Sequence, residues 1–153
     1  MAKFSFNGMD EISASFKQLT NITDEDKMSV LMPAARFLLG RQRDKILSLF
    51  TQHTGDLANS LTIEEKSDDS GVFAYIFPKG KHRGSSTGKR RSKRRSNGKY
   101  SGTNAEVAYI LEYGSPRISP PFHWMENANE EAEDEVIEIQ QEAWNEMLTK
   151  KGL

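Results

Sequence analysis

Ten lysine and arginine residues lie within residues 79–99 of this 153-residue chain, with no acidic residue among them. Closely spaced cations of this kind bind phosphate groups or the acidic surface of another protein. Without them the chain keeps 11 basic against 22 acidic residues, so a cationic loop is set against an anionic body with a formal charge near −11. We define residues 79–103 as the basic loop, with candidate binding residues Lys79, Lys81, Arg83, Lys89, Arg90, Arg91, Lys93, Arg94, Arg95 and Lys99.

Residue types that commonly catalyse reactions or hold metals are sparse. The chain has no cysteine, and its three histidines share no ligand spacing with a carboxylate pair. Glutamates recur at helical spacing near the C-terminus, but a solvated or partner-facing surface explains them better than a metal site. The segment GSSTGKR departs from a phosphate-binding loop because Arg90 follows Lys89. We therefore predict no enzyme activity, metal or cofactor; the residues considered are His53, His82, His123, Glu131, Glu135, Glu138 and Glu142.

The first half of the chain reads mainly as helix. Residues 3–7 alternate like a strand or a docked arm, and residues 10–22 carry Ile12, Phe16 and Leu19 at the spacing of a short amphipathic helix. A long helix should follow Thr23 and run to residue 52, with a kink or two abutting helices at Pro33. We expect Gly55 to end it in a left-handed conformation. Its apolar stripe would hold Met28, Leu31, Ala35, Leu38, Ile46, Leu49 and Phe50, and its solvated face Arg36, Arg41, Arg43 and Lys45.

A β-hairpin is predicted next, over residues 62–65 and 71–78, with a turn at residues 67–71 that is rich in turn formers. Its second strand has three aromatic residues on one face and three aliphatic ones on the other. Because both faces are apolar, we expect this strand to be covered on both sides and to lie at the centre of a small sheet.

After the basic loop, Asn104 can cap a short helix, with a strand as the alternative. Gly114 would end this helix and permits a positive φ. Residues 115–121 contain three prolines and should be extended. A last helix over residues 121–150 has a narrow apolar stripe, and nine acids with no base lie between Glu126 and Glu146. The sequence thus predicts a single α+β domain over residues 1–153, in which a small mixed or antiparallel sheet is packed by a long kinked helix and a long C-terminal helix. We expect neither a signal peptide nor a membrane span, which needs roughly 18 consecutive apolar residues.

Two separated stretches resemble a known family. One is Thr54-Gly55-Asp56-Leu57 with Ser60, at the passage from a long helix into a hairpin. The other runs through Tyr109, Glu112, Tyr113 and Gly114 to Pro120 and Phe122. In this order and spacing they look like the signature of the head–tail joining, or tail-completion, neck proteins of long-tailed phages and prophages. The residues that carry the resemblance are Thr54, Gly55, Leu57, Ser60, Tyr109, Glu112, Gly114, Pro120 and Phe122.

The resemblance implies a structural virion protein at the phage head–tail junction, assembled in the cytoplasm of a bacterial host. It implies a homo-oligomeric ring of roughly six or twelve copies that surrounds the DNA channel. The implied partners are other copies of the chain and the adjoining head-connector and tail proteins. The basic loop would either face the packaged DNA or reach an acidic protein surface. The alternative is a nucleic-acid-binding protein without sequence specificity that acts through the basic loop.

Overall fold

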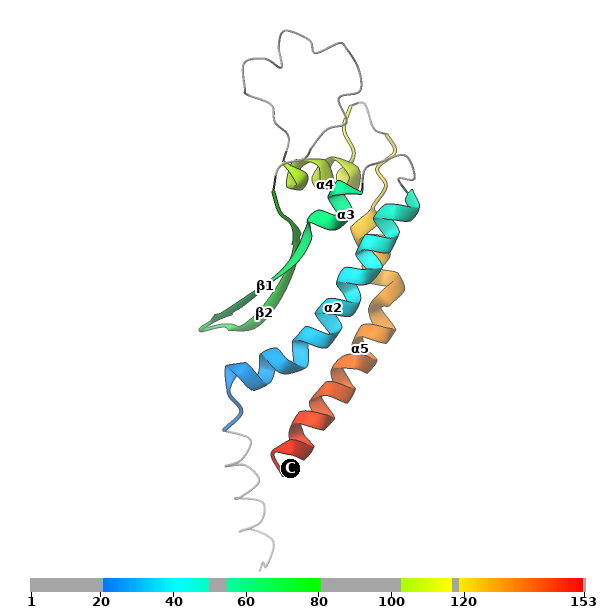
Figure 1. Cartoon of the computed structure of the whole chain (residues 1–153). Helices are drawn as coiled ribbons and strands as arrows, with labels where there is room; N and C mark the ends of the chain where they lie inside the picture. The colour runs from blue at the N-terminus through cyan, green and yellow to red at the C-terminus, as the bar shows by residue number, and fades with distance from the viewer. Residues whose placement is uncertain (1–20, 50–54, 81–102, 117–118, 153) are drawn as a thin grey trace, which may run out of the picture.

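The computed structural model describes residues 21–49, 55–80, 103–116 and 119–152. Two long helices, α2 (Asp24–Leu49) and α5 (Trp124–Lys150), pack along each other and form the body of the molecule (Figure 1). A two-stranded antiparallel sheet of β1 (Leu61–Asp68) and β2 (Gly71–Pro78) packs against α2. Two short helices, α3 (Asp56–Ser60) and α4 (Asn104–Tyr113), lie near the upper end of α5 in Figure 1. The predicted α+β class, with helices packed on a small antiparallel sheet, is confirmed.

Helix α2 is continuous through Pro33, and Figure 1 shows it bent between its first turns and the remainder. Proline removes one backbone hydrogen bond and crowds the preceding turn, which explains the bend. The expectation of a kink is thus confirmed, and that of two abutting helices is wrong. Thr23 begins the helix, since its Oγ1 accepts the Asp26 amide N–H at 3.2 Å and its own N–H donates to the Asp26 carboxylate at 2.8 Å.

The apolar stripe of α2 is rotated from its predicted position. The fully buried positions are Val30, Ala34, Gln42 and Ile46, whereas Leu49 is exposed. Gln42 is buried because it faces α5, where its side-chain amide donates to Asn129 at 2.9 Å. On α5 the predicted stripe holds, with Ala128, Ala132 and Met147 buried.

The sequence predicted that the basic face of α2 is solvated. In the structure, cations of this face also make contacts within the fold. Arg41 pairs with Glu135 at 2.6 Å and Lys45 pairs with Glu131 at 2.5 Å, so the cations of α2 meet the acids of α5. Arg43 instead donates to the backbone carbonyls of Ala58 at 3.1 Å and Leu61 at 2.8 Å. The three side chains hold α2 against α5 and against the junction of α3 with β1.

The hairpin forms with a tight turn at residues 69–70 and pairs Leu61 with Pro78 at its base and Asp68 with Gly71 at its tip. The placement of β2 at the centre of a sheet is wrong, because the described sheet has only two strands. One face of β2 turns Val72 and Ile76 toward the helices. The other face is open, and Tyr75 is 47% exposed beside Phe73, with ring centroids 5.8 Å apart. A strand with apolar residues on both faces is therefore covered on one face only.

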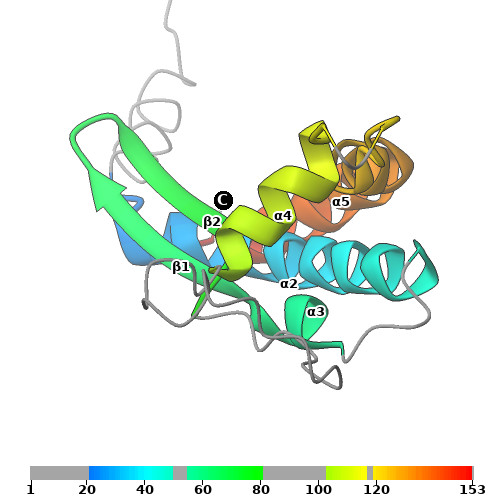
Figure 2. The same ribbon diagram turned by 90° about the horizontal axis from the view of Figure 1, so that it is seen from above.

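The core lies where α2, α3, α4 and the start of α5 meet. Trp124 is fully buried and its indole N–H donates to the Ala108 carbonyl at 3.3 Å. Figure 2, seen from above, shows α4 crossing over the upper ends of β2 and α5. None of the described helices is long and apolar enough to cross a membrane. The buried cluster consists of Ile46, Leu57, Ala58, Leu61, Ala108 and Trp124, with Leu39, Ile76, Val107, Leu111 and Met125 around it.

Candidate functional site

The described residues that carry the resemblance gather at one end of the molecule, which we call the loop end: α3, the bases of β1 and β2, α4 and the first turn of α5. Both described ends of the basic loop, at Lys79–Gly80 and at Thr103, also lie here (Figure 1). The loop end therefore combines the motif residues with the base of the charged segment.

The two ends of the basic loop are fixed side by side. The Lys79 amide N–H donates to the Ser60 carbonyl at 2.9 Å, where β1 begins. The Asn104 N–H donates to the Gly80 carbonyl at 3.0 Å, and the Asn104 side chain donates to the Lys79 carbonyl at 2.9 Å. The two described ends of the basic loop are therefore held together at one point of the surface. Of its ten basic residues only Lys79 is described; the other nine fall within residues 81–102, outside the described part of the chain.

The start of α4 differs by one residue from the prediction. Thr103, not Asn104, is the N-cap: its Oγ1 accepts the Glu106 N–H at 3.1 Å, and the Glu106 carboxylate accepts the Thr103 N–H at 2.9 Å. This reciprocal pair is the capping box that the spacing Thr-x-x-Glu encodes, so a signal for it was present in the sequence. It frees the Asn104 side chain to hold the base of the loop. The helix itself is confirmed over its strand alternative.

Gly55 and Ser60 shape the turn that leads into the hairpin. Gly55 adopts a left-handed φ of 71°, as predicted, and stands directly before α3. Residues 50–54, between α2 and Gly55, lie outside the described part of the chain. The Gly55 carbonyl accepts the Asn59 N–H at 2.9 Å. Ser60 donates from its hydroxyl to the Leu57 carbonyl at 2.7 Å, and Leu57 is buried in the core. Thr54, the first residue of this motif, lies outside the described residues.

Glu112 has the most specific role at the loop end. Its side chain is buried, and its carboxylate accepts the backbone N–H groups of Met125 at 2.7 Å and Glu126 at 3.1 Å. These amides belong to the first turn of α5, whose N–H groups have no partner within the helix and favour a negative charge. Glu112 thus caps α5 from α4 and fixes the angle between the two helices. The resemblance singled out this residue, but nothing in the sequence pattern indicated its role.

Gly114 and the segment after it complete the junction. Gly114 ends α4 with φ 82° and ψ 178°, a conformation that is almost restricted to glycine, which confirms the predicted positive φ. The chain then returns alongside α4, where Phe122 N–H donates to the Leu111 carbonyl at 3.0 Å. Pro120 is exposed, and the peptide bond before it is cis.

An exposed aromatic surface covers the outer side of α4. Tyr109 and Tyr113 are each 64% exposed, and their ring centroids lie 4.8 Å apart. Ile110 and Phe122 are exposed as well. Large amphipathic side chains held at the surface in this way are typical of protein interfaces.

A histidine and two carboxylates meet beside this surface. Atoms of Glu112, His123 and Glu126 that could bind a metal lie within 4.8 Å of one another. Both oxygens of Glu112 already accept amide N–H groups of α5, and His123 Nδ1 lies 3.1 Å from the Glu126 carboxylate. His123 itself has a left-handed φ of 47° as the residue that precedes α5. We interpret the group as the cap of α5. His53 and His82 lie outside the described residues.

Comparisons of the chain with family models, with curated proteins and with solved structures find no match.

Proposed function

We propose that this chain is a structural subunit of a ring at the head–tail junction of a long-tailed phage, where it joins the head connector to the tail and surrounds the DNA channel. The observation that supports this best is the position of the motif residues. Leu57, Ser60, Glu112, Gly114 and Phe122 come from two distant stretches of sequence, yet they lie around one junction of helices and hairpin. Residues of a true signature are expected to build one substructure in this way.

Two surface features fit a subunit whose contacts lie with copies of itself and with neighbouring rings. The tyrosine pair of α4 offers an exposed aromatic contact at the loop end. The outer face of α5 is strongly acidic, while the basic loop carries the opposite charge. In a ring of identical subunits each copy presents the same two surfaces, so the basic loop of one copy can meet the acidic face of α5 of the next.

The role proposed for the basic loop follows from its fixed base. A ring would bring one loop from every copy to the same level, which concentrates positive charge at the lumen or at the adjoining ring. Facing DNA, such loops would contact phosphates without reading the base sequence, which suits a conduit through which the whole genome passes.

The experiment that tests the proposed function locates the protein and its assembly state. Native mass spectrometry of the purified chain over a concentration series should show a weakly associating monomer with a high-mass species that grows with concentration, and labelled protein in intact particles should form a ring at the tail vertex. Tyr109→Ser together with Tyr113→Ser should weaken the ring while leaving the fold intact, with Tyr75→Ser on the open face of the hairpin as the matched control. Protein spread over the capsid surface, or absent from particles, would falsify the neck assignment.

The runner-up function, nucleic-acid binding without sequence specificity, is supported by the ten cations anchored at a single base. It predicts that an isolated subunit binds duplex DNA tightly at low salt. The neck proposal predicts weak binding by the isolated subunit, because its anionic body repels DNA, and stronger binding by the ring. Gel-shift titrations of the isolated subunit and of the ring, over a range of salt, separate the two.

A further inference from the structure

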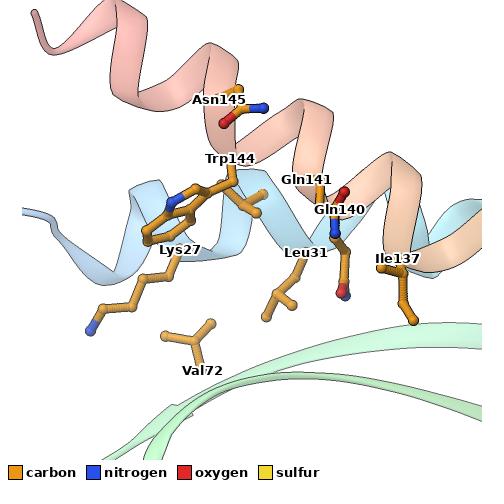
Figure 3. Close-up of a pocket in the computed structure, with 9 residues that line it drawn as sticks. Lys27, Leu31, Val72, Ile137, Gln140, Gln141, Trp144 and Asn145 are labelled. Carbon is orange, nitrogen blue, oxygen red and sulfur yellow. The ribbon is translucent and has the colours of Figure 1, made fainter. Parts of the chain in front are cut away.

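An open apolar groove runs between α2, β2 and α5 at the end of the molecule opposite the loop end (Figure 3). Its volume is roughly 580 Å³, and its apolar lining consists of Val30, Leu31, Val72, Ile137 and Trp144. Two of these are large side chains left in contact with solvent, since Ile137 is 43% and Trp144 is 39% exposed. Figure 3 shows Leu31 and Val72 approaching the hollow from two sides, with Ile137 and Trp144 above it from α5.

The chain enters the described part of the molecule next to this groove. Thr23 and Asp26 cap the start of α2, which fixes the point where the chain changes direction. Lys151, just beyond α5, donates to the Asp26 carboxylate at 2.5 Å and lies 3.5 Å from the Asn21 carbonyl. Lys27, on the wall of the groove, is only one turn further along α2. The described chain therefore begins, at Asn21, beside the Lys27 end of the groove.

The length and pattern of residues 10–20 match the groove. Residues 10–20 as a helix would be about 16 Å long, and the α5 wall from Ile137 to Asn145 extends over about 12 Å. A helix that folds back through a short turn at residues 21–23 runs antiparallel to α2. Its stripe of Ile12, Phe16 and Leu19 would then face the groove along its length.

We propose that residues 10–20 of the same chain occupy this groove as a short amphipathic helix, with Ile12, Phe16 and Leu19 against Leu31, Val72 and Trp144. The short connection favours the chain's own segment over that of a second copy, because only residues 21–23 separate it from α2 and little chain entropy is lost in closing so short a link. Docking of the segment would hold whether or not the chain forms a ring.

The absence of cysteine from the sequence allows a direct test by disulfide trapping in the full chain. Phe16→Cys combined with Gln141→Cys places one thiol on the apolar stripe of the segment and one on the groove wall. Ala14→Cys with Gln141→Cys is the matched control, since residue 14 lies on the opposite face of the predicted helix. A docked segment should form an intrachain disulfide at least about tenfold faster in the first pair than in the second, because a disulfide requires close Cβ atoms. Equal rates in the two pairs, or no disulfide, would overturn the proposal. A disulfide-linked dimer would also overturn it and assign the groove to a second copy.

Tryptophan fluorescence gives a second readout without cysteines. Phe16→Ser in the full chain should shift the emission to longer wavelength and increase quenching by acrylamide, because Trp144 loses its cover while Trp124 stays buried. Lys17→Ser, outside the apolar stripe, should change neither. The effect of Phe16→Ser should vanish in a Trp144→Phe background. An effect that persists there would place the change elsewhere and contradict docking on Trp144.

Discussion

The two ends of the molecule are built differently. At the loop end, Trp124, Leu61 and Ala58 are at most 1% exposed. Each helix that begins there also has a defined start: Thr103 caps α4, and Gly55 and His123, both left-handed, precede α3 and α5. At the opposite end, which we call the hairpin end, the sides of α2 and α5 that face β2 leave an open groove, and polar contacts also join the elements. Ser67 donates to Asp24 at 2.6 Å there, and Lys151 pairs with Asp26.

The loop end thus has a closely packed core, whereas the hairpin end has an apolar surface that is open to solvent. A closely packed interior stabilises the fold by itself, whereas an apolar groove gains stability only when something covers it. The loop end can therefore present the basic loop and the tyrosine pair from a rigid base. The hairpin end, by contrast, keeps an apolar groove that the proposed docking of residues 10–20 would cover. Five changes, from the largest expected effect to the smallest, test this contrast.

Trp124→Ala should give the largest loss, because it empties the centre of the loop-end core and removes the bond to the Ala108 carbonyl. We expect the free energy of unfolding to fall by about 3–5 kcal/mol, measured by urea denaturation. The matched change at the hairpin end, Trp144→Ala, should cost less than about 2 kcal/mol because that side chain is partly exposed. Equal losses at the two positions would remove the contrast between the ends.

Glu112→Ala should be the next most severe change. It leaves two amide N–H groups at the start of α5 without an acceptor in a mostly buried place, and we expect a loss of about 2–3 kcal/mol. Glu112→Gln keeps one acceptor oxygen and should lose less. Glu106→Ala, which breaks only the exposed capping box of α4, should cost about 1 kcal/mol. If Glu112→Ala proved no worse than Glu106→Ala, Glu112 would not be the residue that positions α5.

Ile76→Ala probes the hairpin where it meets the core. The sequence alone, which placed β2 between two covered faces, predicts about 2–5 kcal/mol. The structure leaves Ile76 half-buried on a two-stranded sheet, so we expect about 1–2 kcal/mol. Tyr75→Ala on the open face should cost less still, and a larger loss at Tyr75 than at Ile76 would mean that the open face is covered in solution.

Acid should weaken the hairpin end first. Hydrogen bonds from Lys151 and Thr23 lower the pKa of the Asp26 carboxyl to about 2, below its ordinary value of 3.8. A carboxyl whose pKa is lowered in the folded state stabilises the fold at pH values above its pKa in the unfolded chain. That contribution is lost as the pH falls from near 4 through 2. In unfolding measurements over this range, Asp26→Asn should be less stable than the native chain at pH 7 and the two should converge at low pH. A difference that stays constant with pH would show that the Lys151 pair does not drive the shift. The side chains are partly exposed, so the effect is small.

The smallest effect on stability is expected from the basic loop. Replacing its basic residues from Lys89 to Arg95 with serine should change the unfolding free energy by less than about 0.5 kcal/mol, as for ordinary surface positions. The loss should appear in ring assembly, in docking to the adjoining ring or in salt-dependent DNA binding by the ring. Normal assembly and infectivity of the substituted protein would leave the loop without either proposed role.

The sequence by itself determined the α+β class, the hairpin, the stripe of α5, the bend at Pro33 and the positive φ of Gly55 and Gly114. These features follow from local chemistry: the period of apolar residues, the constraint on proline and the freedom of glycine. The sequence also contained the spacing that signals a capping box at Thr103, although Asn104 was predicted as the cap.

Only the tertiary structure decided which polar residues face a partner within the fold. Arg41, Lys45 and Gln42 look like surface residues in sequence, yet they meet α5, because a helix–helix interface is set by the rotation of both helices together. Glu112 likewise reads as one acid among many, and its role as the cap of α5 exists only because the chain turns back at Gly114. The exposure of β2 on one face was also beyond the pattern, since periodicity shows which faces are apolar and not whether a further layer covers them.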